Sequence, residues 1–116
     1  MLQTSRRTFT PPTDIIELKD RLVVLVEIAG MRIDDFKVIL QDAKHLIIMG
    51  QRQRPTFESP AYYQVEISVG HFRIDVQLPY AIDRERVEAH YADGFLRIDL
   101  PRRIQHIQIQ DSTNGN

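Results

Sequence analysis

The sequence predicts an all-β domain folded as an antiparallel β-sandwich. Period-2 alternation of apolar and polar residues runs through most of the chain, whereas helical periodicity is nearly absent. An Asp93-Gly94 pair stands between two alternating runs, which is the strongest short-range signal for a β-hairpin because both turn positions need positive φ. About seven or eight short strands separated by turn signals are typical of a sandwich.

The expected strands are alternating runs and one short apolar run, 46–49, and they are separated by turn signals. In chain order these runs cover 22–29, 36–41, 46–49, 63–68, 72–78, 87–91 and 96–100. Pro79 and Pro101 close the strands before them, because proline cannot donate to a strand ladder. The segments 31–36 and 81–86 can each hold one helical turn, the second with Asp83 as its N-cap.

Composition excludes several classes of function. Lysine and arginine total 15 and aspartate and glutamate total 16, so the net charge of −1 argues against nucleic-acid binding by bulk charge. The chain has no cysteine, hence no disulfide or thiolate site. Its longest aliphatic run, 22–26, is far shorter than a membrane span, and no secretory signal stands at the start. We therefore expect no membrane partner and a cytoplasmic protein.

Motifs for catalysis or cofactor binding are absent from the sequence. The five glycines are too widely spaced for a nucleotide loop, and the four histidines lack metal-ligand spacing. No serine stands in a nucleophile elbow. We expect a protein that is not an enzyme and that needs no cofactor or metal.

The chain divides into three parts. Residues 1–12 are polar and contain Pro11-Pro12, so they predict a short extended arm, and 13–103 form the domain. The tail, 104–116, carries three isoleucines, which a fully solvated tail would not normally contain.

The hairpin and the tail together resemble the small heat-shock proteins. The stretch 89–96 matches the A-x-x-x-(N/D)-G-x-L signature of the α-crystallin domain. The matching residues are Ala89, Asp93, Gly94, Phe95 and Leu96. Residues 70–79 resemble the family stretch G-x-F-…-L-P, and Ile107-Gln108-Ile109 matches its C-terminal I-x-I motif. The chain departs from the family where an arginine and a phenylalanine are usual, with Ile74 and Val76 at those positions.

The resemblance implies an immunoglobulin-like sandwich that acts as an ATP-independent holdase on non-native client proteins. Ile107 and Ile109 would form a tail latch, since residues two apart on an extended chain point the same way and can enter one groove. By resemblance, Val38, Leu40 and Ala89 line the receiving groove, with ordinary core packing as the alternative role for each.

The excursion 51–61, with Pro55 and Pro60, precedes a segment that the family uses for pairing. By resemblance this segment would add to the sheet of a partner chain and form a homodimer, from which a higher homo-oligomer could be built. This dimer segment comprises Tyr62, Tyr63, Gln64, Val65 and Glu66. The alternative is a flexible hairpin loop.

Two other functions compete with the holdase. A co-chaperone or interaction module of the related CS type shares the sandwich, but the I-x-I tail and the signature hairpin favour a small heat-shock protein. A β-sandwich enzyme or carbohydrate binder is disfavoured because the chain has no tryptophan and only four tyrosines.

Overall fold

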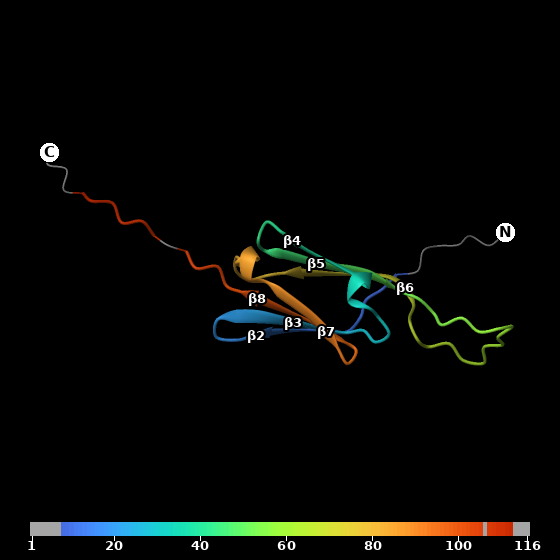
Figure 1. Ribbon diagram of the computed structural model, residues 1–116. Coiled ribbons are helices and arrows are strands. Elements are labelled where there is room, and N and C mark those ends of the chain that lie inside the picture. The colour runs from blue at the N-terminus through green and yellow to red at the C-terminus, as the bar shows by residue number, and fades with distance from the viewer. Residues whose placement is uncertain (1–7, 106, 113–116) are drawn as a thin grey trace, which may run out of the picture.

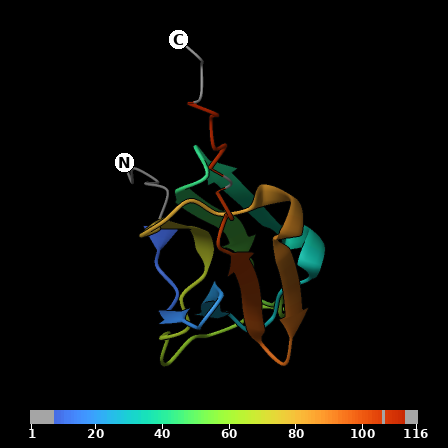
Figure 2. The ribbon, with the colours of Figure 1, turned by 90° about the vertical axis from the view of Figure 1, so that its left-hand side faces the viewer.

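Two four-stranded sheets stack face to face in the computed structural model, which describes residues 8–105 and 107–112 (Figures 1 and 2). One sheet has the strand order β1-β6-β5-β4 and the other β2-β3-β8-β7. The strands are β1 (Thr8–Phe9), β2 (Thr13–Glu17), β3 (Arg21–Glu27), β4 (Phe36–Gln41), β5 (His45–Arg52), β6 (Gly70–Gln77), β7 (Glu88–Ala92) and β8 (Phe95–Pro101). The predicted all-β, immunoglobulin-like sandwich is confirmed.

The turns form where the sequence predicts them. Asp93 and Gly94 have φ values of 53° and 83°, so the β7–β8 hairpin turns with both central residues at positive φ. Each of the two expected helical turns is a single 3-10 turn, η1 (Ile33–Asp35) and η2 (Arg84–Arg86). The Asp83 carboxylate caps η2 by accepting a hydrogen bond of 3.2 Å from the Glu85 backbone N–H.

The core lies between the sheets and is built by the alternating apolar positions. Antiparallel register places Val24 beside Ile98 and Ile48 beside Ile74, and all four are buried. Hydrophobic burial of these rows is the main source of the sandwich's stability. At the family arginine position, Ile74 is one of these core residues.

The segment 63–68 is not a strand in the single chain, and in this respect the predicted run is wrong. The β5–β6 ladder ends at the pair Arg52 and Gly70, and among the residues that the structure describes the 53–69 loop pairs with no strand. Alternation alone cannot make a strand without a backbone partner. The end of the predicted arm also differs from a free extension, because Thr8–Phe9 pairs in parallel with β6 at His71 and Phe72.

Candidate functional site

Strands β4 and β7 are the edge strands on one side of the sandwich, and together they form what we call the β4–β7 edge. Val38 stands in register with Ile48, and Ala89 with Ile98, so both face the interior side of their sheets. Yet Val38 is 36% exposed and Ala89 is also exposed, whereas both of their neighbours are fully buried. The β4–β7 edge thus offers inward-facing apolar side chains that the chain itself does not cover.

Contacts at its two ends bound the β4–β7 edge. At one end the Phe36 ring packs against the Tyr91 ring, with centroids 5.3 Å apart. Toward the other end the Arg84 guanidinium donates a hydrogen bond to the Leu40 carbonyl oxygen. Leu40 itself is buried in the core, so of the three residues predicted to line a groove, it fits the alternative role of core packing best.

The isoleucines of the tail are exposed and lie apart from this edge. Ile107 is 83% exposed and Ile109 is 90% exposed, and neither belongs to a strand. The tail begins where Arg102 pairs with Ile82, and the Arg103 N–H donates to the Ala81 carbonyl over 2.8 Å. Beyond this anchor it runs away from the sandwich (Figure 1). The structure therefore does not bring the latch and Val38 together within one chain.

The 53–69 loop projects from the end of the sandwich opposite to the tail (Figure 1). It carries large apolar side chains that are exposed to solvent. Its exposed members are Phe57, Tyr62, Tyr63, Val65 and Ile67. All five residues predicted to form the dimer strand lie on this loop and are exposed. Uncovered aromatic and aliphatic side chains on one loop are typical of a surface for association.

Strand β2 is the other candidate surface, because it forms the free edge of its sheet. Ile15 stands in register with the buried Val24 and faces inward, but it is 52% exposed. Its neighbour Ile16 on the outer face is exposed as well. An edge strand with unpaired backbone groups and apolar side chains is a template for an added strand.

The signature hairpin between β7 and β8 has a structural role. Leu96 is fully buried, whereas Phe95 is exposed on the outer face. The Gly94 carbonyl accepts a hydrogen bond of 2.8 Å from the Ile28 N–H. Asp93 and Gly94 thus make a tight turn whose backbone also holds the turn that follows β3.

Tyr91 is a residue whose role the sequence pattern did not indicate. Its hydroxyl donates to the Ile28 carbonyl over 2.8 Å and accepts from the Met31 N–H over 3.2 Å. A tyrosine on an inward-facing strand position needs a partner for its hydroxyl, and this is the signal that could have identified it. The contact fixes β7 to the turn between β3 and η1.

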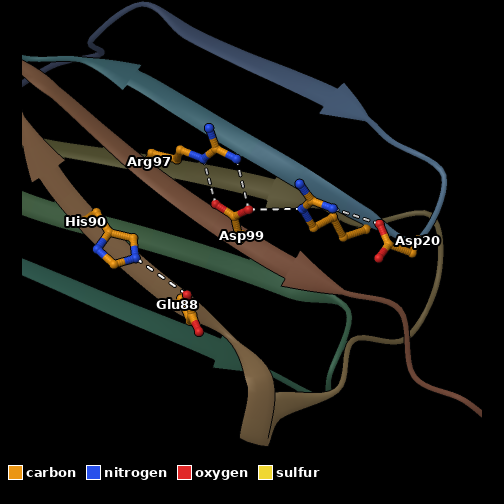
Figure 3. A network of polar contacts seen from close by, with 6 residues as sticks. Asp20, Glu88, His90, Arg97 and Asp99 are labelled. Carbon is orange, nitrogen blue, oxygen red and sulfur yellow. Dashed lines mark hydrogen bonds and ion pairs between the residues drawn. The ribbon is translucent and has the colours of Figure 1, made fainter.

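Charged residues cover the outer face of the β2-β3-β8-β7 sheet (Figure 3). Asp99 accepts from Arg97 at 2.7 Å and from Arg21 at 3.0 Å, and Arg21 also pairs with Asp20 at 2.8 Å. The hydrogen bond from Arg97 holds the pKa of Asp99 below its ordinary value, and Arg21 adds to this while partial burial opposes it. Glu88 and His90 lie beside this network, with 3.5 Å between His90 Nε2 and Glu88 Oε2.

Across 8–105 and 107–112, no group of three or more histidine, aspartate or glutamate side chains is placed to hold a metal ion. In that part of the chain no helix has the length and apolar character that crossing a membrane requires.

Two stacked, mainly antiparallel sheets, a signature hairpin and an isoleucine-bearing tail define a protein of the α-crystallin-domain class. The model of the Hsp20/alpha crystallin family matches residues 14–113. The chain belongs to this family, which comprises the small heat-shock proteins.

Individual relatives agree with this assignment. The chain is 31% identical over 93 residues to the 17.7 kDa class II heat shock protein of Arabidopsis thaliana, covering 78% of this chain and 60% of that protein. It is 29% identical over 102 residues to small heat shock protein C4 of Rickettsia felis, covering 87% and 62% respectively. The chain thus spans less than two thirds of the length of each of these two relatives.

Solved structures show the same fold. Heat shock protein 16.0 from Schizosaccharomyces pombe superimposes with a TM-score of 0.74 at 26% identity, over 88% of this chain and 99% of that one. A small heat-shock protein from Xylella fastidiosa gives a TM-score of 0.74 at 24% identity, over 89% of this chain and 98% of that one.

Proposed function

We propose that this chain is an ATP-independent holdase that binds non-native client proteins, assembles through homodimers and does not refold its clients. The observation that carries the proposal is the amount of apolar surface left uncovered at three places in a member of this family. These are the 53–69 loop, the β2 edge and the tail. Uncovered apolar surface on this scale fits association with other chains and with unfolded segments.

The dimer forms when the 62–66 segment of one chain adds to the β2 edge of its partner. Both elements are five residues long, and within the described part of the chain neither has a strand partner on its free side. In an extended segment Tyr63 and Val65 point the same way, so they can cover Ile15 of the partner's edge strand. Backbone pairing then gives affinity, and the apolar side chains fix the register.

The latch joins dimers into larger assemblies. Ile107 and Ile109 of one chain insert beside Val38 and Ala89 at the β4–β7 edge of another chain, where inward-facing apolar side chains stand uncovered. Each tail is bound weakly, so subunits exchange. We propose a cytoplasmic location on the sequence features given above.

Aggregation of a heat-labile client tests the proposal. We expect the chain, at near-stoichiometric ratios and without nucleotide, to slow light scattering by the client across a temperature series, and added ATP to change nothing. An equal mass of a stable, non-chaperone protein is the control. If the client aggregates equally fast with the chain and with the control at every temperature, the chain is not a holdase.

A further inference from the structure

The two limbs of the 53–69 loop are held together at its base by side chains rather than by the strand ladder. Backbone pairing of β5 and β6 stops at Arg52 and Gly70. The Arg52 guanidinium donates from Nε and Nη2 to the Ser68 carbonyl oxygen, over 3.0 and 2.7 Å. One step further out, Arg54 Nη2 donates to the Ile67 carbonyl over 3.2 Å. Two arginines on the outgoing limb therefore bind carbonyls on the returning limb.

Arg52 also connects the loop to the turn that follows β3, which belongs to the opposite layer of the sandwich. Its Nη1 donates to the Ala29 carbonyl over 3.2 Å. Ala29 lies in the turn that Tyr91 and Gly94 hold through their contacts with Ile28. The loop base is thus tied, through one guanidinium, to a part of the fold that is itself fixed to β7 and β8.

The end of the N-terminal arm meets the same guanidinium. Arg52 Cζ lies 5.2 Å from the centroid of the Phe9 ring, and that ring packs on Phe72 with centroids 5.6 Å apart. A pocket of about 210 Å³ lies between β1 and the loop, lined by Phe9, Arg54 and residues 65–69 among others. The arm, the loop and the turn that follows β3 therefore all contact Arg52.

We propose that Arg52 is the positioning residue of the loop. It fixes the base of the loop against the arm and against the turn that follows β3. In this way it holds the 62–66 segment in place to pair with a partner chain. Arginine suits this role because its planar fork can bind two carbonyls in different directions while stacking on a ring. A lysine ammonium is a single point charge and cannot keep all of these contacts. The second part of the proposal rests on the proposed dimer, whereas the first does not.

Arg52→Lys in the full chain tests both parts, because it keeps the charge and removes the fork. Hydrogen exchange of the loop amides reports positioning, and dilution followed by light scattering reports dimer dissociation. Loss of one hydrogen bond from a charged donor corresponds to about tenfold or more in an opening equilibrium. We expect loop exchange in 53–69 to rise at least about tenfold, and the dimer dissociation constant to rise by a similar factor.

Two further variants make the result specific. Arg86→Lys is the matched control, since Arg86 lies in η2 at the end of the sandwich opposite the loop (Figure 1) and its ion pair with Asp83 is long, at 4.0 Å. It should leave loop exchange unchanged. Phe9→Leu removes only the ring and keeps both carbonyl contacts, so we expect a smaller rise in exchange than in Arg52→Lys. Circular dichroism confirms that each variant folds.

The outcomes distinguish a failure of the positioning role from a failure of the proposed dimer. Unchanged loop exchange in Arg52→Lys overturns the positioning role, whatever the oligomeric state. A rise in loop exchange without any change in dimer dissociation overturns the link between loop order and pairing. If the wild-type chain is a monomer at all concentrations, the dimer fails, and loop exchange still decides whether Arg52 positions the loop.

Discussion

Replacing Ile107 and Ile109 by glycine tests the proposed latch, because it removes both isoleucine side chains of the I-x-I motif and leaves the rest of the sequence unchanged. Both side chains are almost fully exposed, so nearly all of their apolar surface is available for burial at a partner's β4–β7 edge. Full burial of each contributes about 1.5–3 kcal/mol, or about 3–6 kcal/mol for the pair. Ordering residues 107–109 costs about 1–2 kcal/mol each, which leaves at most about 3 kcal/mol per tail.

A net contribution of this size predicts that an isolated tail peptide binds more weakly than about 1 mM, whereas several tails in one assembly act together. We expect size-exclusion chromatography with light scattering to show a mass for the double variant that falls toward the dimer. Ile104→Gly is the matched control, since it removes an exposed isoleucine outside the I-x-I motif and should leave the mass unchanged. An identical mass for the wild type and the double variant would refute the latch.

Three further substitutions test the fold that presents these surfaces. Gly50→Ala places a Cβ 2.5 Å from a ring carbon of Phe72, so we expect a loss of about 1–3 kcal/mol in chemical denaturation, and an unchanged midpoint would contradict this packing. Tyr91→Phe removes a hydroxyl that makes two hydrogen bonds, and we expect a loss of about 1–2 kcal/mol, whereas a neutral effect would mean that the hydroxyl does not fix the turn after β3. The lowered pKa of Asp99 means that its contribution is present above the ordinary pKa of 3.8 and is lost as the pH falls through the folded value. Asp99→Asn should therefore cost about 1 kcal/mol at neutral pH and flatten the acid limb of the stability curve below about pH 4, and a limb as steep as the wild type's would contradict it.

Alternation and turn chemistry were enough to predict most of the fold. The runs 22–29, 36–41 and 72–78 became β3, β4 and β6 because each places apolar side chains on one face and ends at a turn signal. The Asp93-Gly94 hairpin formed because only residues that tolerate positive φ fit there. Local patterns were sufficient for these strands, whereas β1 and β2 also pair within the chain and were not among the expected runs.

The same reasoning failed where the structure depends on a partner or on long-range contacts. The 63–68 run alternates as well as any other, but it pairs with no strand among the residues that the structure describes. Nothing in the sequence indicates the proposed positioning role of Arg52, because that role depends on three segments that meet only in the folded chain. The exposure of Val38 and Ala89 likewise follows from their position on edge strands rather than from their residue type.

The mass of the intact chain in solution tests the dimer-based proposal most directly. Light scattering across a dilution series should give twice the 13.6 kDa of one chain, or an even multiple of it, down to the concentrations at which a client is protected. A mass of one chain throughout that range would contradict pairing through the 62–66 segment and the β2 edge.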